Sequence, residues 1–319
     1  MANTPKVSVL IPTYNYAYCI DEAIQSVLDQ DFSDFELVVI DDCSKDNTDE
    51  VMLKYSDDQR ITYLRNEKNL GLVGNWNKCL TYAKGEYIKL LCADDKFRPD
   101  LLGKMVGVME QNPTVSLVIC NKEMFGKSTA RVKLPLQHLH SGREIIYNTL
   151  NTYGWLGEPT CIMFRHSNLQ SEGAFKKDLI WLPDWEMWIR QLNVGDAYFI
   201  PEALAYVRNH EGQLTKTVMK KYINYFEEYN MCRDIRAHKG YSIDTSGIDM
   251  DKVVKKRAEN VAKAMYKLLP RVYKPEERKI FFRALKIAWD EQVIFSSLGQ
   301  VFKKAPAKKI LTVEEISAA

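Results

Sequence analysis

The sequence has no long uninterrupted hydrophobic segment, and its longest apolar runs have the length of a β-strand. A membrane-spanning helix needs about 20 consecutive apolar residues, so we expect none. The first residues, MANTPKVSVLIP, lack the basic segment, long apolar core and cleavage site of a signal peptide. Seven cysteines, an odd number without a CxxC pair, argue against a disulfide framework and a zinc ribbon. These absences predict a cytoplasmic protein with reduced cysteines.

The charge of the chain is unevenly distributed. Of the 319 residues, 46% are hydrophobic and 27% charged, which is ordinary for a globular protein of one large or two modest domains. Residues 1–215 hold 22 basic and 29 acidic residues, a net charge of −7, and residues 216–319 hold 22 and 13, a net charge of +9. The basic segment is either a solvated helical surface or a face for anionic lipid or substrate. Nucleic acid is the weaker alternative, because no binding motif accompanies the charge.

The first 120 residues alternate between predicted strands and helices. Strands are predicted at 7–11, where Pro12 stops the run, and at 35–42, 60–66, 86–93 and 115–120. Apolar helical patterns separate them. The run FELVVIDD is apolar through most of its length, as expected when helices cover both faces of a parallel sheet. The pattern therefore predicts a doubly wound α/β layer.

The remaining chain is less regular. PDWEMWIRQLNVG predicts a helix with Pro183 near its start and Gly195 beyond its end, and residues 196–210 predict a strand pair broken at Pro201. From about residue 216 the patterns are helical and basic.

Three polar clusters follow predicted strands of the α/β layer: PTYN at 12–15, DDCSKDNT at 41–48 and ADD at 93–95. Ligands of such sheets bind in the crevice beyond the carboxyl ends of the strands. The clusters therefore predict a binding site at this edge.

Asp94 and Asp95 are adjacent carboxylates at the end of a buried strand. Such a pair suits Mg²⁺ or Mn²⁺, which prefer oxygen ligands and share themselves with substrate phosphates. The alternative is an acidic cluster that favours the N-terminus of the following helix.

The segment after the second strand combines Asp41 and Asp42 with a Ser44, Asp46 and Thr48 spacing that predicts a tight hydrogen-bonded turn. One aspartate is a candidate acceptor for a nucleobase N–H, and a simple capped turn is the alternative. In PTYN, Tyr14 is a candidate to stack on a base and Asn15 to fix the loop through its side chain.

Five segments occur together and in order: VSVLIPTYN, FELVVIDDCSKDNT, RNEKNLGLVGNWNKCL, GEYIKLLCADD and PDWEMWIR. In this combination, residues 5 to 215 resemble inverting glycosyltransferases of family 2 with the GT-A fold. The resemblance implies a Rossmann-like, mostly parallel central sheet with helices on both faces, followed here by a C-terminal helical extension. It also implies a glycosyltransferase domain at 1–215, with a nucleotide-sugar half to about 120 and an acceptor half from 121. Residues 216–319 then form the basic helical region.

The resemblance places the donor nucleotide on the first three motifs. Asp42 would contact the base, and Arg65 is the expected contact from RNEKNLG. The first loop would line the nucleotide with Pro12, Thr13, Tyr14 and Asn15.

The same resemblance makes Asp94 and Asp95 the DxD-type site that holds the metal and the donor diphosphate. Many members read Asp-x-Asp-Asp, and here Cys92 stands first. This departure leaves the metal, Mn²⁺ or Mg²⁺, to Asp95 and places Asp94 on the ribose or behind the metal ligands. His210 matches a position where relatives often carry histidine, which would touch the diphosphate or metal; a satisfied polar histidine is the alternative.

Asp184 takes the place of the family's catalytic carboxylate, with Pro183 where a glutamate is usual. Tryptophans at 181, 185 and 188 would raise the pKa of Asp184. Glu186 is the rival base, about 200° away on an ideal helix, so that only one of the two faces the cleft. Arg190 is expected to be a structural ion-pair partner.

The implied reaction is metal-dependent transfer of a hexosyl or N-acetylhexosaminyl group from a nucleoside-diphosphate sugar, UDP by family habit. The acceptor would be a hydroxyl of a glycan or lipid-linked saccharide in surface polysaccharide synthesis, met by the basic helices at the inner face of the membrane. A nucleotidyltransferase would need a Gly-rich loop, which PTYNYAYC lacks, and a glycoside hydrolase leaves the nucleotide motifs unexplained. A non-catalytic sugar-nucleotide module is the other alternative, because of Cys92 and Pro183.

Overall fold

The structure is a computed structural model, and it describes residues 4–127, 130–132, 138–152, 156–211, 218 and 221–298. The chain divides into two compact units that are described separately here. The first comprises Met1–Ile146, Gly154–Asp178 and Pro183–Glu211, and the second comprises Tyr147–Tyr153, Leu179–Leu182 and Gly212–Ala319.

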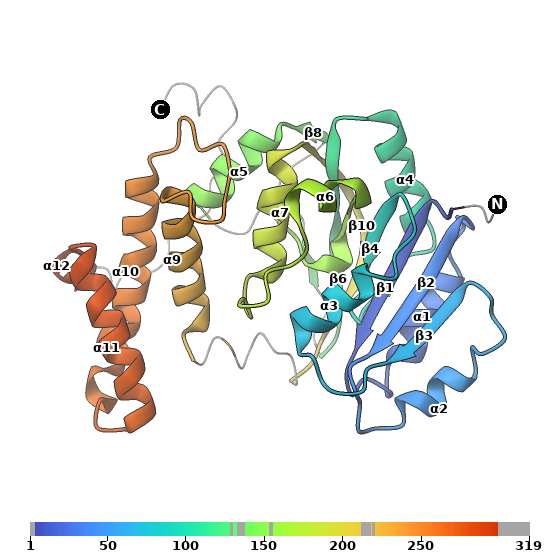
Figure 1. Ribbon diagram of the computed structural model, residues 1–319, viewed down its shortest axis with the longest axis horizontal. Helices are drawn as coiled ribbons and strands as arrows, with labels where there is room; N and C mark the ends of the chain where they lie inside the picture. Colours follow the sequence, from blue (N-terminus) through green and yellow to red (C-terminus); the bar gives the residue numbers. More distant parts are fainter. Residues whose placement is uncertain are drawn as a thin grey trace. The chain divides into compact units, whose positions relative to one another are not determined.

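The first unit is built on a ten-stranded sheet with the order β3-β2-β1-β4-β9-β6-β10-β5, in which β7 pairs with β6 and β8 with β10 (Figure 1). Strands β3, β2, β1 and β4 are parallel, whereas β9 runs antiparallel to both β4 and β6. The strands are β1 (Val7–Thr13), β2 (Phe35–Asp41), β3 (Ile61–Arg65), β4 (Tyr87–Leu90), β5 (Lys96–Phe97), β6 (Val115–Gly126), β7 (Ala130–Val132), β8 (His138–His140), β9 (Ile162–Arg165) and β10 (Asp196–Asn209).

Strands β1, β2 and β4 are buried along nearly their whole length, because helices cover both faces of the sheet. Helix α3 packs against β1 and β2, and in Figure 1 α3 and α7 lie in front of the sheet and α1 behind it. The predicted α/β layer is thus confirmed. Its helices are α1 (Ile20–Leu28), α2 (Thr48–Leu53), α3 (Leu72–Leu80), α4 (Leu101–Gln111), α5 (Gly142–Asn151), α6 (Leu169–Glu172) and α7 (Pro183–Asn193), with 3₁₀ turns η1 (Pro159–Cys161) and η2 (His166–Asn168).

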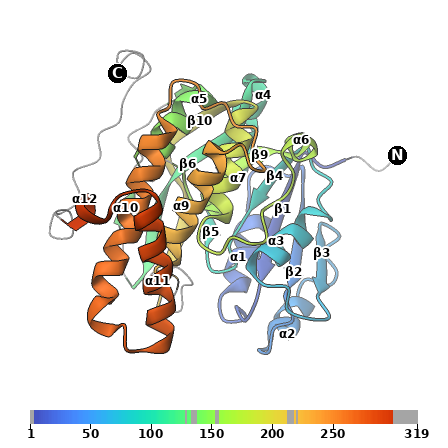
Figure 2. The same cartoon turned by 60° about the vertical axis from the view of Figure 1, so that its left-hand side comes forward.

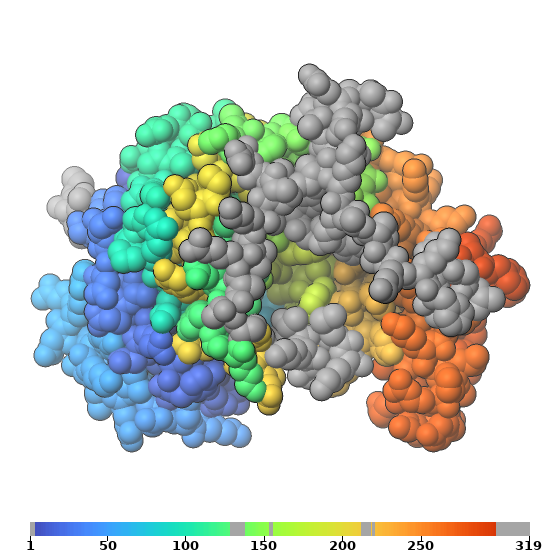
Figure 3. Space-filling model, turned by 180° about the vertical axis from the view of Figure 1, so that it is seen from behind, coloured from blue at the N-terminus to red at the C-terminus, as the bar shows by residue number. Residues whose placement is uncertain are grey.

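Two predictions about proline were wrong. Strand β1 continues through Pro12 to Thr13, because beyond Leu10 it pairs with β2 alone and the missing N–H of proline is tolerated there. Strand β10 is one continuous strand rather than a pair, because register shifts after Ile200 and Ala203 absorb Pro201 as a bulge. Seen from behind, yellow residues of the β10 region lie beside green residues of β6, its parallel partner (Figure 3).

The second unit is helical. Helix α10 (Met250–Leu268) packs against α9 (Ile223–Arg236), α11 (Pro275–Asp290) and α12 (Ile294–Leu298), and Figure 2 shows α10 and α11 side by side. Its buried face repeats at helical spacing through Val254, Ala258, Val261 and Met265. Among the described helices, none is both long enough and apolar enough to cross a membrane.

Candidate active site

The sheet order β2-β1-β4 brings the three polar clusters to one edge. These strands are parallel, so their carboxyl ends point the same way, and the segments after Thr13, Asp41 and Leu90 begin there. Strand β10 adds Arg208 and His210 from its own carboxyl end, because the two hydrogen bonds from Arg208 reach Asp94 and Asp95.

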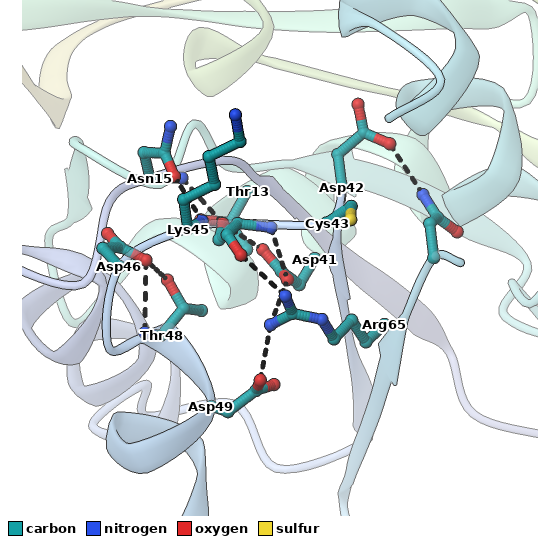
Figure 4. A network of polar contacts seen from close by, with 12 residues as sticks. Thr13, Asn15, Asp41, Asp42, Cys43, Lys45, Asp46, Thr48, Asp49 and Arg65 are labelled. Atoms are coloured by element: carbon teal, nitrogen blue, oxygen red, sulfur yellow. Dashed lines mark hydrogen bonds and ion pairs between the residues drawn. The ribbon is translucent and has the colours of Figure 1, made fainter. Parts of the chain in front are cut away.

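The first two clusters are tied together by Asn15 (Figure 4). The Asn15 backbone N–H donates to Ser44 Oγ at 2.7 Å, and its Oδ1 accepts from the Lys45 N–H at 2.8 Å. Asn15 has a left-handed φ of 59°, a conformation that asparagine adopts more readily than most residues. The sequence expectation that Asn15 fixes this loop is confirmed by its contacts.

Asp41 and Arg65 hold the loop that follows β2. Asp41 is fully buried and accepts from the Ser44 N–H at 3.0 Å and from the Ser44 hydroxyl. Arg65 pairs with Asp41 at 3.3 Å and with Asp49, and donates to the Ser44 carbonyl at 2.6 Å (Figure 4). The predicted hydrogen-bonded turn is present, and the Arg65 guanidinium stabilises it through these contacts.

Asp42 accepts three hydrogen bonds from the segment that follows β3. Asn66 Nδ2 donates at 2.9 Å, and the backbone N–H groups of Leu70 and Gly71 donate at 2.7 and 2.9 Å. A carboxylate has about four acceptor positions, so one is left for a ligand. Asn75 is buried beneath this arrangement and donates to the Ile40 carbonyl at 2.9 Å. Sequence reasoning missed Asn66 and Asn75, although the asparagine-rich run RNEKNLGLVGNWN was a signal for them.

The first loop presents both apolar and polar groups. Pro12 is half-buried, and the Tyr14 side chain, 39% exposed, is accessible for stacking. Thr13 is 2% exposed, and among the described residues its hydroxyl has no hydrogen-bond partner. A buried hydroxyl without a protein partner is uncommon, and an ordered water or a ligand group is the usual partner at such a position.

The cluster after β4 places candidate ligand atoms of Cys92, Asp94 and Asp95 within 4.8 Å of one another. Asp94 Oδ2 lies 2.9 Å from His210 Nε2, and the Asp94 carbonyl accepts from Arg208 Nε at 2.8 Å. Burial raises the pKa of the Cys92 thiol well above its usual range, so the thiol stays protonated. The cluster therefore offers two carboxylates and a neutral thiol.

Asp95 is the more buried carboxylate, at 4% exposure. Its Oδ2 accepts from Thr160 Oγ1 at 2.6 Å and its Oδ1 from the Arg208 N–H at 2.9 Å. Burial, and then the charge of Asp94, raise the pKa of Asp95 to about 7. A divalent cation that prefers oxygen ligands fits this donor set, because its positive charge would favour the ionised forms of Asp94 and Asp95. Phosphate oxygens could occupy its remaining coordination positions.

Asp184 lies in the first turn of α7, directly after Pro183. Its Oδ1 accepts from the Trp185 N–H at 2.9 Å. Burial, and then the charge of Glu158, raise the pKa of Asp184 to about 7. A carboxyl group with this pKa is half ionised near neutral pH, which suits a general base.

Glu186, the rival base, is fully buried in an ion pair. Arg190 Nε and Nη2 donate to its two oxygens at 2.9 and 2.8 Å, and Lys176 lies at 3.3 Å. Arg190 also donates to the Ala174 carbonyl at 2.9 Å. The expectation that Arg190 is a structural ion-pair partner is confirmed, and Glu186 is the residue it holds.

Glu158 was not singled out from the sequence. It precedes η1, pairs with Lys122, and its charge raises the pKa of both Asp95 and Asp184. The charge of Glu158 thus acts on carboxylates of both the cluster after β4 and the start of α7, although for Asp95 burial and the charge of Asp94 have the larger effects.

Comparisons with known proteins agree with this geometry. The family model described as "Glycosyl transferase family 2" matches residues 8–173. A putative colanic acid biosynthesis glycosyl transferase, WcaA of Escherichia coli, is 29% identical over 77% of this chain and 88% of its own length. The Escherichia coli β-1,3-glucosyltransferase WfgD, named for UDP-Glc and α-D-GlcNAc-diphosphoundecaprenol, is 36% identical over 42% of this chain and 54% of its own.

Among solved structures, Staphylococcus aureus TarS 1–349 in complex with UDP-GlcNAc superposes with a TM-score of 0.70 at 21% identity. The match covers 93% of this chain and 83% of that one. This likeness confirms the predicted GT-A architecture with helices after it.

Proposed function

This chain belongs to glycosyl transferase family 2, and we propose that it transfers a sugar, with inversion, from a nucleoside-diphosphate sugar to a hydroxyl of a glycan or lipid-linked acceptor. The group moved is a hexosyl or N-acetylhexosaminyl unit. One observation carries the proposal: Asp94 and Asp95, whose ligand atoms lie within 4.8 Å of each other, follow β4 at the sheet edge where the loops after β1 and β2 also begin. An inverting transfer needs a base at the acceptor and charge stabilisation at the leaving diphosphate.

The donor nucleotide is proposed to bind at the ends of β1 and β2. The remaining acceptor position of Asp42 suits a base N–H, the exposed ring of Tyr14 suits stacking, and the Thr13 hydroxyl has a bond to make. Pro12 and Asn15 complete the loop, and Arg65 acts through the turn that it braces. UDP is the proposed nucleotide, since WfgD and the TarS complex are both described with UDP-sugars.

Mn²⁺ or Mg²⁺ is proposed to be held by Asp95, with Asp94 and His210 beside it facing the diphosphate. The cation would neutralise charge on the leaving diphosphate. Thr160 and Arg208 hold Asp95 in a fixed orientation through one hydrogen bond to each of its oxygens. Both oxygens retain a second lone pair for a ligand.

Asp184 is proposed to act as the general base. Its carboxylate takes the proton of the acceptor hydroxyl as that oxygen forms a bond to the anomeric carbon, and the bond from this carbon to the diphosphate oxygen breaks. Attack from the face opposite the leaving group inverts the anomeric configuration. The electron pair leaves with the nucleoside diphosphate, and the proton remains on Asp184 until it passes to solvent. Base assistance of this kind contributes about 10²- to 10⁴-fold.

The acceptor is proposed to be a surface polysaccharide intermediate reached at the inner, anionic face of the plasma membrane. Helix α11 presents exposed Phe282 and Trp289 on the same side as exposed Arg278, Lys279 and Lys286. Aromatic rings among basic side chains suit the boundary between lipid headgroups and acyl chains.

The proposal is tested by measuring nucleoside diphosphate release from a panel of sugar nucleotides with Mn²⁺ and a diphosphate-lipid acceptor. Product NMR gives the anomeric configuration. We expect turnover of one UDP-sugar with inversion, lost in Asp95→Ala and Asp184→Asn. Activity that survives both changes would remove these residues from their roles, and donor binding without turnover in the wild type would favour the non-catalytic module.

A further inference from the structure

A fully buried ammonium group lies beneath the carboxylate cluster. Lys89 of β4 is 0% exposed, and its Nζ donates to the carbonyls of Thr160 at 2.5 Å, Leu90 at 3.2 Å and Pro159 at 3.3 Å. The same Nζ lies 4.6 Å from the centre of the Phe97 ring. An ammonium group has three N–H donors, so these carbonyls satisfy all of them.

A buried cation is costly, because its hydration must be replaced by protein dipoles. A methionine would fill the same space without that cost. Burial lowers the pKa of Lys89 to about 8, so the group remains largely charged at neutral pH. The hydrogen bonds of the Lys89 side chain given within the described part of the chain all go to backbone carbonyls, and its charge also attracts that of Asp95.

Two of those carbonyls, of Pro159 and Thr160, belong to the turn η1 that orients Asp95. Thr160 accepts from Lys89 through its carbonyl and donates from its hydroxyl to Asp95 Oδ2 at 2.6 Å. The Cys92 N–H also donates to the Thr160 hydroxyl, at 3.3 Å. A hydroxyl has one proton, so a Thr160 fixed in this way directs it to Asp95.

The contact of Lys89 with the Phe97 ring is linked indirectly, through strands β5 and β10, to the other oxygen of Asp95. Phe97 lies in β5, which pairs with β10 at Ala205 and Tyr206. Two residues further along β10, the Arg208 N–H donates to Asp95 Oδ1 at 2.9 Å. One hydrogen bond to Asp95 therefore comes from the turn that Lys89 holds, and the other comes from β10, which pairs with the strand that carries Phe97.

We propose that Lys89 is a positioning residue of the metal site, which holds Thr160 and the β5–β10 edge so that Asp95 presents its remaining lone pairs to the cation. The inference rests on the proposed metal-binding role of Asp95. Groups behind a metal ligand typically change metal affinity about 10- to 100-fold when they are removed.

The test compares Lys89→Met with Thr160→Val, and each with a matched exposed control, Lys54→Met and Thr81→Val. Binding of Mn²⁺ alone is followed by EPR and binding of UDP without metal by calorimetry. We expect the Kd for Mn²⁺ to rise about 10- to 100-fold in Lys89→Met and Thr160→Val, the double variant to be no weaker than the worse single one, and UDP binding to stay unchanged. The controls should match the wild type.

Unchanged Mn²⁺ affinity in Lys89→Met would overturn the inference, and so would equal losses of Mn²⁺ and UDP binding. If Lys89→Met does not fold, Thr160→Val decides: a wild-type Kd for Mn²⁺ overturns the inference and a 10-fold rise supports it. A wild-type protein that binds no Mn²⁺, with or without UDP, would instead contradict the metal part of the proposed function and remove the inference with it.

Discussion

Replacing Asp184 by asparagine separates the chemistry of the proposed base from its cost to the fold. The amide has nearly the same shape and keeps an oxygen for the Trp185 N–H, which donates at 2.9 Å. It cannot accept the acceptor's proton. We therefore expect kcat to fall about 10²- to 10⁴-fold while the KM for the donor changes little, because donor binding uses other residues.

The wild-type pH profile carries the same information. With a pKa of about 7, Asp184 is about one-tenth ionised at pH 6 and about nine-tenths ionised at pH 8. The rate should accordingly rise about tenfold between these values and then level off. In Asp184→Asn the residual rate should lose this rise.

Stability should change in the opposite sense. The pKa of Asp184 is raised from 3.8 to about 7 in the folded protein, so the unfolded chain releases the proton first. The folded state therefore loses stability as the pH rises from about 4 to about 7. At about 1.36 kcal/mol per pKa unit, ionised Asp184 costs the fold about 4 kcal/mol above pH 7. Asp184→Asn removes this cost, so it should stabilise the protein at pH 8 and make little difference at pH 4.

The assay combines steady-state kinetics from about pH 5.5 to 8.5 with urea denaturation at about pH 4 and about pH 8, on either side of the interval between the unfolded and folded pKa values of Asp184. Asp178→Asn, an exposed position, is the matched control and should alter neither quantity. A variant that loses both activity and stability at pH 8 would refute the reasoning, because a structural aspartate behaves in that way. A pH-independent wild-type rate would refute it too.

Three further predictions follow from single contacts. Glu186→Gln should lower the free energy of unfolding by about 3–5 kcal/mol in urea denaturation, because it leaves the Arg190 charge buried without a counter-charge at this position, while the pH midpoint of kcat stays in place. Asp42→Ala should raise the donor KM more than tenfold in initial-rate assays, since the segment it holds and the base contact are lost together (~1.4 kcal/mol per tenfold). Phe282→Ser with Trp289→Ser should reduce co-sedimentation with anionic vesicles at constant activity on a soluble acceptor, and binding unaffected by the pair or by salt would exclude that face.

The ends of the parallel strands were predictable because a strand that is buried on both faces is a mostly apolar run, and polar residues follow it. Apart from Glu36, the run from Phe35 to Ile40 is apolar, and the polar residues that begin at Asp41 mark the end of the strand. Asp94 and Asp95 mark the end of β4 in the same way, although Lys89 interrupts that strand. Once such strands are parallel, their polar ends must converge, so the site edge follows from the pattern alone.

The pairing of strands that are distant in the sequence produces no comparable local pattern. Nothing in the local sequence around Ile162–Arg165 indicates that this strand lies antiparallel between β4 and β6. This placement brings Thr160 and Glu158 to the site, so a role in the site could not be predicted for either residue from the local sequence. Such contacts depend on packing between residues that are distant in the sequence. The same is true of the buried Lys89 ammonium group, because the sequence alone shows only a polar residue within a strand.

The choice between Asp184 and Glu186 illustrates the same limit. Helical geometry indicated that only one of them faces the cleft but not which one. The structure distinguishes them by partner: Glu186 is held in an ion pair by Arg190, whereas burial and the charge of Glu158 raise the pKa of Asp184. A raised pKa makes Asp184 the candidate base, and the ion pair gives Glu186 a structural role.

The two departures from the family pattern leave the proposed chemistry intact. Pro183 is the first residue of α7, a position where proline is favoured because its missing N–H would have no helical partner, and it leaves Asp184 in the first turn. Cys92 stands where many members have a carboxylate, and burial keeps its thiol neutral, so the cluster contains two carboxyl groups rather than three. Two carboxylates are sufficient for a cation whose other ligands are phosphates. Both changes therefore remove groups that the proposed mechanism does not require, which weighs against the non-catalytic alternative.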